Sequence, residues 1–292
     1  MSKQCQGIAR SGKRCSITST SQLTNDSGRL AADPLRRGGD YCLFHAKPFC
    51  TKEIAENADH QLVVILIDLE STGIDISQDR IVELAALHVP ADPRFHGSSF
   101  STIVCVEDSV LEERGEAAAS VHGISREEIA SGIPFSRAWY MFTDWLERVL
   151  NVVVTESWDS DDERVETPRI AVESLQILMA GHNSIRFDLP LLLAECTRHC
   201  LETHCFERWL FADTLHLFQG GHGCCKLQCL VKDLYAPNEL KAHRALDDCI
   251  ALRRVVESVA QRLGMSLPTL LEKVAVHVDM PSSLAQLSVL ME

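Results

Sequence analysis

The sequence lacks any run of apolar residues long enough to cross a bilayer, since no charge-free stretch reaches ~18–20 residues. Its first residues, Met1 to Cys5, also lack the apolar segment of a secretory signal peptide. We therefore expect an intracellular protein, nuclear or cytoplasmic, with no membrane partner. In such a reducing compartment, the 12 cysteines should be free thiols or metal ligands and not a disulfide framework.

Positive charge is also scarce, because 28 Lys and Arg residues stand against 41 Asp and Glu residues, a formal net charge of −13. A field of this sign does not attract polyanions to the whole surface. A nucleic-acid partner would have to be drawn by bound metal ions or by a small basic patch. The length of 292 residues allows one large domain with its own core and one small domain.

Residues 1–50 contain no long hydrophobic period, so this segment cannot bury a core of its own. Four of its residues have the chemistry of zinc ligands: Cys5, Cys15, Cys42 and His45. Cys42 and His45 are spaced as a close ligand pair, and the two earlier cysteines bracket a glycine-containing turn. One Zn²⁺ in a tetrahedral site would supply the folding energy that packing cannot. Cys50 is an alternative ligand, and a tail with incidental cysteines is the alternative to a zinc site.

The pattern of this segment, CxG…GxRC…YCxxH, resembles small zinc-binding modules at the ends of eukaryotic proteins related to nucleic acids. We expect residues 1–50 to form such a module and residues 51–60 to form a linker. The segment is locally basic, so a contact with nucleic acid or with a protein partner is an open alternative.

The first strong signal of the larger domain is an apolar, β-branched run, Val63 to Ile67, which predicts a buried strand. The run ends on Asp68 and Glu70, which lie on the same face of a strand because they are two residues apart. Two carboxylates at the end of a buried strand repel each other, and a divalent cation held between them removes the repulsion. Solvated acids at an ordinary strand end are the alternative.

The pattern that follows indicates an α/β domain with a mixed sheet, because strands come first and then alternate with helices. Further strands are predicted over 79–89, 100–106 and 175–179, and helices over 134–150, over 189–200 and from 245 onward. Ser125 and Glu128 have the spacing of a helix capping box. Residues 155–168 are acidic and polar and are expected to form an exposed loop.

Two more acids follow at the ends of predicted elements. Asp188 lies between a strand and a helix, Asp248 lies one turn into the last helix, and His243 lies just ahead of that helix. If the four acids converge, two Mg²⁺ ions ~3.5–4 Å apart would make a site for in-line phosphodiester displacement. A histidine with a pKa near neutrality can take the proton from the attacking water.

Three segments in this order, 68–73, 182–188 and 243–248, resemble the three motifs of DnaQ-like 3′→5′ exonucleases of the DEDDh branch. They read Asp-Leu-Glu-Ser-Thr-Gly, His-Asn-Ser-Ile-Arg-Phe-Asp and His-Arg-Ala-Leu-Asp-Asp, and the first is similar to the TREX-type form. The resemblance implies an RNase H-like fold with a mixed five-stranded sheet flanked by helices. It implies an exonuclease domain over 61–260 and a helical extension over 261–292.

The resemblance also implies roles for individual residues. The four acids would hold two Mg²⁺ or Mn²⁺ ions, and His243 would be the general base. Substrate would contact Leu69 and Thr72 of the first motif and Asn183 of the second. The implied activity is hydrolysis at the 3′ ends of single-stranded DNA or RNA, with release of nucleoside 5′-monophosphates.

Two alternatives stay open. The chain can be an exonuclease-like adaptor without activity, although a binding module has no physical reason to keep four mutually repelling carboxylates. A second zinc site is possible on Cys196, His199, Cys200 and His204, but buried cysteines commonly act as small apolar residues. The sequence does not distinguish ribose from deoxyribose substrates, and it leaves the oligomeric state open.

Overall fold

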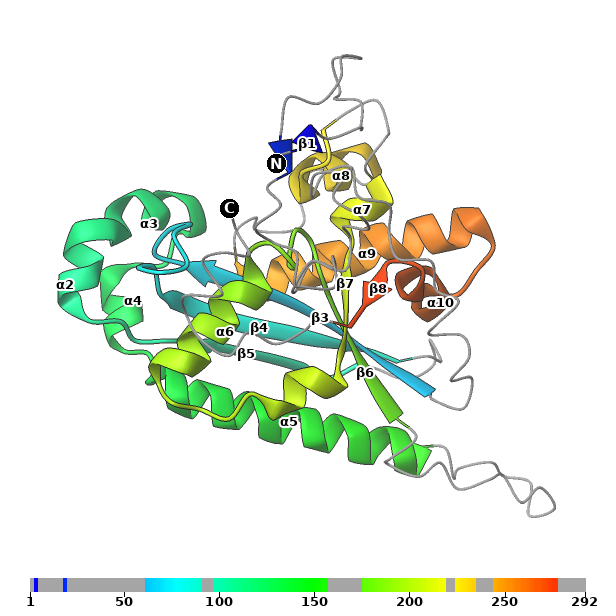
Figure 1. Ribbon diagram of the computed structural model, residues 1–292, viewed down its shortest axis with the longest axis horizontal. Helices are drawn as coiled ribbons and strands as arrows, with labels where there is room; N and C mark the ends of the chain where they lie inside the picture. The colour runs from blue at the N-terminus through cyan, green and yellow to red at the C-terminus, as the bar shows by residue number, and fades with distance from the viewer. Residues whose placement is uncertain are drawn as a thin grey trace.

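The computed structural model describes residues 61–90, 97–156, 175–218, 224–234 and 244–277, together with two short N-terminal strands. These strands, β1 (Lys3–Gln4) and β2 (Thr18–Ser19), pair antiparallel. The larger described part of the chain forms one mixed sheet with helices on both faces (Figure 1).

Six strands make up the large sheet, in the order β5-β4-β3-β6-β7-β8. β3, β4 and β5 form an antiparallel meander, β6 and β7 continue parallel to β3, and β8 pairs antiparallel with β7. The predicted α/β fold with a mixed sheet is thus confirmed. The strands are β3 (Gln61–Ser71), β4 (Ile81–Val89), β5 (Ser99–Ile103), β6 (Leu175–Gly181), β7 (Leu210–Asp213) and β8 (Ala275–Val276).

The predicted count of five strands is wrong, because β8 adds a sixth strand at the edge of the sheet. β8 has two residues, too few for the alternation by which a strand is recognised in a sequence. It belongs to the segment that the sequence assigns to a C-terminal extension. Leu270, Leu271 and Val276 of that segment are buried, so the core continues past residue 260.

β3 is the central strand around which both halves of the core form. Its odd-numbered residues, such as Ile65 and Ile67, pack in one apolar cluster, and Val64 and Leu66 pack in the other. A strand that is covered on both faces reads as a continuous apolar run instead of an alternating one. This explains why the run from residue 63 to residue 67 is the strongest strand signal in the chain.

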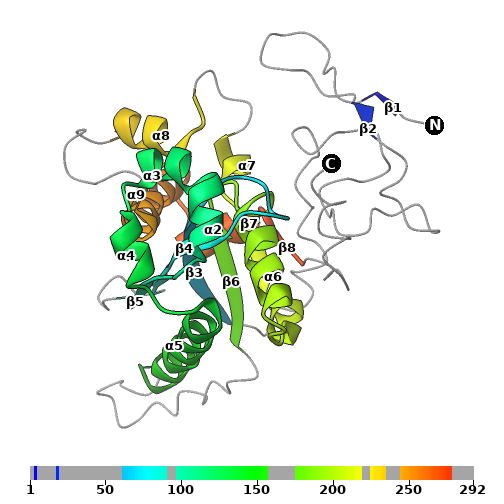
Figure 2. The same ribbon diagram turned by 90° about the vertical axis from the view of Figure 1, so that its left-hand side faces the viewer.

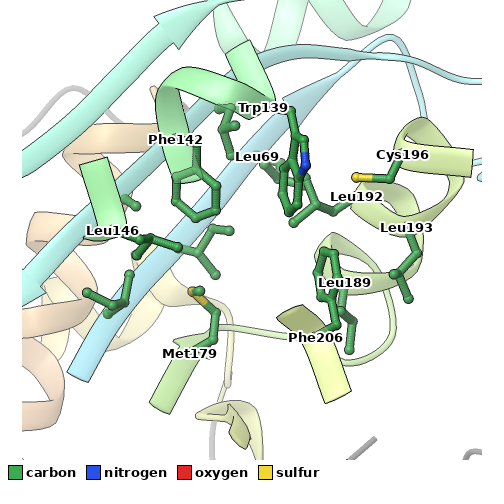
Figure 3. Packing of buried hydrophobic residues seen from close by; sticks show 14 of the residues in the cluster. Leu69, Trp139, Phe142, Leu146, Met179, Leu189, Leu192, Leu193, Cys196 and Phe206 are labelled. Carbon is green, nitrogen blue, oxygen red and sulfur yellow. The ribbon is translucent and has the colours of Figure 1, made fainter. Parts of the chain in front are cut away.

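Two helices, α5 (Phe135–Glu156) and α6 (Asp188–Arg198), cover one face of the sheet. Aromatic side chains fill this layer, and Figure 3 shows Trp139 of α5 beside Phe142, close to Leu192 of α6. The rings of Trp139 and Phe206 stack with their centroids 5.3 Å apart. α5 runs six residues beyond its predicted end at 150, so residues 155 and 156 of the predicted acidic loop are helical. Residues 157–174 lie outside the described part of the chain.

The opposite face is covered mainly by α9 (Ala245–Leu263) and α10 (Leu267–Glu272). In Figure 2, α9 and α6 lie on opposite sides of β3. α8 (Leu227–Leu234) packs against α9, and the short α7 (Leu215–Phe218) follows β7. Buried Leu252, Val255 and Val256 of α9 bring the start of this helix over the end of β3.

A group of short helices lies beyond β5 at one end of the sheet (Figure 1). The capping box of α4 forms as predicted, since the N–H of Glu128 donates to Ser125 Oγ and the N–H of Ser125 donates to the Glu128 carboxylate. α3 ends at Gly123, whose φ of 69° is favourable for glycine. The helices are α2 (Asp108–Val110), the π-helix η2 (Leu111–Gly115), α3 (Glu116–His122) and α4 (Arg126–Ala130). The 3₁₀ helix η4 (His204–Arg208) precedes β7.

Cys224 and Cys229 form a disulfide, with their Cα atoms 5.8 Å apart. The expectation that all cysteines are free thiols or metal ligands is therefore wrong for this pair. The spacing of five residues gives no hint of a bond in the sequence, and the start of α8 brings the two side chains together. No helix in the described ranges is long and apolar enough to span a membrane.

Candidate active site

The end of β3 places two predicted site residues on the face of the sheet that α9 covers. Val64 and Leu66 of this strand pack with the apolar residues of α9. Asp68 and Glu70 continue the same row, because every second residue of a strand faces the same side. Both carboxylates are therefore directed toward the start of α9.

Asp248 of α9 completes an acidic cluster with these two residues. It lies in the first turn of the helix and is buried. Oxygen atoms of Asp68, Glu70 and Asp248 all lie within 4.8 Å of one another. Within the described residues, no other group of three or more His, Cys, Asp or Glu side chains converges in this way. Carboxylate oxygens are the ligands that Mg²⁺ and Mn²⁺ prefer, so the donor set fits a divalent cation.

Asp188, the fourth predicted acid, is the first residue of α6 and is also buried. Its Oδ1 accepts a hydrogen bond of 3.1 Å from the backbone N–H of Leu69. Leu69 lies between Asp68 and Glu70, so this bond joins the second motif directly to the first. The structure thus brings all four predicted acids to one end of the sheet.

Burial and mutual repulsion oppose ionisation of these acids. Burial raises the pKa of Asp68 well above its ordinary value, and the charges of Asp188, Asp248 and Glu70 add to the effect. Burial, followed by the charges of Asp248 and Glu83, raises the pKa of Glu70 to about 8. Burial also raises the pKa of Asp188. A divalent cation would reverse this balance, because it replaces repulsion with attraction in the same space.

Asp213, at the end of β7, holds the loop that leads to Asp188. Its buried carboxylate accepts hydrogen bonds from the N–H groups of Asn183 at 2.8 Å, Leu215 at 2.9 Å and Ile185 at 3.3 Å. Asn183 has a φ of 68°, a left-handed conformation that the bond to Asp213 helps to hold. Asp213 therefore positions the second motif rather than joining the acidic cluster.

A cavity of about 560 Å³ opens beside Glu70. Of the three residues predicted to bind substrate, Leu69 and Thr72 line this cavity and Asn183 does not. The side chains of Ile74 and Val121 also line it and are 85% and 54% exposed. Exposed apolar side chains beside a polar site provide surfaces on which a planar ring can stack or pack.

The wall of this cavity at Thr72 is fixed by a buried polar network. Thr72 Oγ1 donates to Asp79 Oδ1 at 2.8 Å, and Asp79 Oδ2 accepts from the N–H of Asp75 at 2.7 Å. The N–H of Thr72 donates to the carbonyl of Arg80 at 2.9 Å. The N–H groups of Leu69 and Thr72 therefore both have acceptors within the protein.

The other predicted site residues lie outside the described part of the chain or away from the cluster. His243 and the zinc ligands Cys5, Cys15, Cys42 and His45 are outside the described residues. Arg244, the residue after His243, is described and occupies the N-cap position of α9. Cys196 is buried in the apolar core and the ring of His199 stacks on Phe135, which favours the packing role for this helix over a second zinc site.

Sequence reasoning gave no role to Asp213, Glu83, Ile74 or Val121. A signal was present for the two acids, since each interrupts or ends an apolar strand: Glu83 stands between Val82 and Leu84, and Asp213 follows Ala212. An acid at such a position must find partners, but the sequence does not say which. Ile74 and Val121 carry no signal that separates them from ordinary surface residues.

Comparison with known proteins finds similarity to exonucleases and oligoribonucleases. Residues 65–160 match the profile of a protein family described as "Exonuclease". The match covers most of β3 and all of β4, β5 and α5, and it includes Asp68 and Glu70 but not the other two acids.

Two curated relatives illustrate the extent of the similarity. The chain is 25% identical over 132 residues to an oligoribonuclease of Mycobacterium ulcerans, covering 44% of this chain and 54% of that protein. It is 24% identical over 248 residues to "Exonuclease DPD1, chloroplastic/mitochondrial" of Arabidopsis thaliana, covering 77% of this chain and 65% of the relative. The chain thus spans about half the length of the oligoribonuclease that it matches.

Among solved structures, the chain is similar to E. coli Exonuclease I, determined in complex with a dA16 oligonucleotide. The TM-score is 0.50 at 17% identity, and the similarity covers 73% of this chain and 42% of the other. At this identity the likeness speaks for the fold. The profile match and this likeness agree on an α/β fold of the kind found in exonucleases.

Proposed function

We propose that this protein is a metal-dependent 3′→5′ exonuclease that acts on single-stranded DNA or RNA. The observation that carries the proposal is the convergence of Asp68, Glu70 and Asp248, with Asp188 tied to the same strand, beside an open cavity. The similarity to exonucleases and oligoribonucleases supports the same reaction class.

The four acids would hold two Mg²⁺ or Mn²⁺ ions. These ions would neutralise the charge that develops on the scissile phosphate and its leaving oxygen. The cluster fits this task because its charges are buried and close together, a costly arrangement without cations.

The reaction is hydrolysis of the last phosphodiester bond. The oxygen of a water molecule bonds to phosphorus while the bond from phosphorus to the 3′ oxygen of the preceding nucleotide breaks. The products are a nucleoside 5′-monophosphate and a chain shortened by one nucleotide. We assign the proton acceptor for this water to His243, which precedes Arg244 at the start of α9.

The cavity would receive the terminal nucleotide. Leu69, Ile74 and Val121 offer apolar contacts to a base or sugar, and Glu70 stands where the cavity meets the acidic cluster. These contacts read no base sequence, so we expect degradation with little sequence preference.

The test uses single-stranded DNA and RNA labelled at either end, with Mg²⁺ or Mn²⁺. The account predicts immediate release of a 3′ label, a ladder of shortening products from a 5′-labelled strand, and neither from the Asp68→Ala variant. Loss of the 5′ label first would contradict the direction of the reaction. Tight binding without degradation would favour the adaptor function.

We further propose that residues 1–50 bind one Zn²⁺ through Cys5, Cys15, Cys42 and His45. The Cys42→Ser variant should lose one equivalent of zinc, measured by elemental analysis of the purified chain, and should keep its activity. Unchanged zinc content would refute this module. The nuclear or cytoplasmic location stays a prediction, and the name of the Arabidopsis relative places that protein in chloroplasts and mitochondria.

A further inference from the structure

Glu83 is a fifth carboxylate beside the acidic cluster, and the reaction proposed above does not use it. It lies on β4 directly across from Glu70 in the antiparallel register, on the same face of the sheet. Its side chain is buried. A buried carboxylate opposite another carboxylate is unfavourable unless it has strong partners.

Four hydrogen bonds satisfy Glu83, two at each oxygen. Oε2 accepts from Arg244 Nε at 3.1 Å and from the backbone N–H of Ala245 at 3.1 Å. Oε1 accepts from Arg244 Nη2 at 3.2 Å and from Ser101 Oγ at 3.3 Å. The two bonds from the guanidinium make a bidentate ion pair, a geometry that fixes direction as well as distance. Glu83 would have to give up these bonds to bind a cation.

Arg244 and Ala245 form the start of α9. Arg244 is the N-cap residue, and its own side chain makes no capping hydrogen bond. Glu83 supplies the missing acceptor from β4, and its negative charge lies at the positive end of the helix dipole. α9 is thus capped from the sheet and not by its own sequence.

The same short segment also contains His243 and Asp248, the two residues of the third motif to which the proposed function gives a role. The N–H of Asp248 donates to the carbonyl of Arg244 at 2.9 Å, so Asp248 is one helical turn from the pair. His243 is joined to Arg244 by a peptide bond. Any shift of Arg244 relative to β4 would therefore move Asp248 relative to Asp68 and Glu70.

We propose that Glu83 and Arg244 are a positioning pair, which fixes the start of α9 against β4 and so sets the distance of Asp248 from the β3 carboxylates. This inference rests on the proposed function, because it concerns the same cation site. The Glu83 side chain is buried and that of Arg244 is 35% exposed. Such an ion pair contributes little to net stability compared with apolar packing, but it can specify one arrangement of two elements. The pair therefore acts mainly on how well the site holds cations.

The experiment compares Mn²⁺ binding and folding in full-length variants. Glu83→Gln keeps the shape of the side chain but removes its charge, and Arg244→Lys keeps the charge but removes the bidentate geometry. Glu257→Gln is the matched control, since Glu257 pairs with an arginine as Glu83 does but lies on α9 with its side chain 44% exposed. Free Mn²⁺ is followed by electron paramagnetic resonance, and folding by circular dichroism and thermal unfolding.

We expect Glu83→Gln to need about 10–100-fold more Mn²⁺ for half-saturation. This is the usual effect of losing a residue that orients a metal ligand without binding the metal itself. For Arg244→Lys, the Mn²⁺ concentration for half-saturation should lie between those of Glu83→Gln and the wild type. Glu257→Gln should bind Mn²⁺ as the wild type does. The native circular dichroism spectrum should persist in all three. If Glu83→Gln does not fold, Mn²⁺ binding is compared between Arg244→Lys and the wild type.

Two results would overturn the inference, and they are distinguishable. Wild-type affinity for Mn²⁺ in both Glu83→Gln and Arg244→Lys, with only thermal stability reduced, would make the pair merely structural. A wild-type chain that binds no Mn²⁺ would refute the proposed function itself, and with it the role of the pair. A wild-type chain that binds Mn²⁺ but degrades no nucleic acid would refute only the exonuclease proposal.

Discussion

Two sets of acids, one buried and one half-buried, lie within the same end of the sheet, and they differ in their partners. Glu83 and Asp213 each accept several hydrogen bonds from backbone N–H groups or from a guanidinium. Asp68 and Glu70 instead have other carboxylates as their main charged neighbours. The first set anchors loops and helices, and the second set creates a local excess of negative charge.

This difference shows how one residue type serves two tasks in one site. A carboxylate whose oxygens are occupied by donors stabilises the fold that it joins. A carboxylate held against other carboxylates makes the metal-free fold less stable and becomes favourable only with a cation. Asp68 and Glu70 therefore lower the stability of the metal-free fold, whereas Glu83 and Asp213 stabilise it and hold the segments that carry the other acids in place.

The largest effect that separates the two sets is expected at Asp68. Asp68→Asn removes a cation ligand, and losing several kcal/mol of charge stabilisation should lower the rate by ~10³-fold or more. The metal-free variant should unfold at the same temperature as the metal-free wild type or higher, because one repulsive charge is gone. Activity assays and thermal unfolding in a chelator measure the two quantities.

Asp144→Asn is the control for this substitution, since Asp144 is exposed on α5 and pairs with Arg148. It should change neither activity nor stability measurably. An Asp68→Asn enzyme that keeps its rate, or one that is strongly destabilised without metal, would place Asp68 in the anchoring set.

The opposite pattern is expected at Asp213. Asp213→Ala leaves the N–H groups of Asn183, Ile185 and Leu215 without their acceptor, at a cost of roughly 3 kcal/mol in the free energy of unfolding. Urea unfolding measures this loss. Wild-type stability in this variant would show that Asp213 does not hold the second motif.

A smaller effect follows from the raised pKa of Glu70, about 8 in the folded chain against 4.5 ordinarily. A carboxyl whose pKa is raised by folding binds more protons in the folded state, so its contribution to stability is lost as pH rises toward 8. We expect the metal-free protein to melt a few degrees lower at pH 8 than at pH 6.5. Mg²⁺ should restore more stability at pH 8 than at pH 6.5.

One other group with a shifted pKa, His88, acts outside this pH window. Burial lowers the pKa of His88 to about 4. His88 therefore affects stability only below about pH 6.5, and there the stability rises with pH instead of falling. Glu70→Gln should weaken the dependence between pH 6.5 and pH 8, and the part that remains comes from Asp68 and Asp188, whose pKa values are also raised. An equally steep dependence in this variant would assign the effect to another group.

The sequence predicts most of the sheet because buried strands leave strong local patterns. Val63 to Ile67 marks β3, and the stripe of Phe135, Trp139 and Phe142 marks α5. β8 escapes prediction because two residues carry no periodicity. The acidic residues of the site are predictable because they follow elements that local patterns locate.

The partners of the anchoring acids could not be predicted, because they are distant in the sequence. Glu83 and Arg244 are separated by 161 residues, and Asp213 is 30 residues from Asn183. No local pattern in strand 79–89 says that Glu83 caps a helix near the end of the domain. Only the folded arrangement of β4 and α9 joins the two segments.

The central claim is that the acids with carboxylate neighbours, Asp68 and Glu70, hold divalent cations, and Mn²⁺ binding tests it most directly. Electron paramagnetic resonance of the full-length wild type and of Asp68→Asn would be recorded at pH 8 with increasing Mn²⁺. The account predicts saturable binding of two ions by the wild type and loss of that binding in the variant. Equal binding by the two proteins would contradict the claim, because Asp68 would then hold no cation.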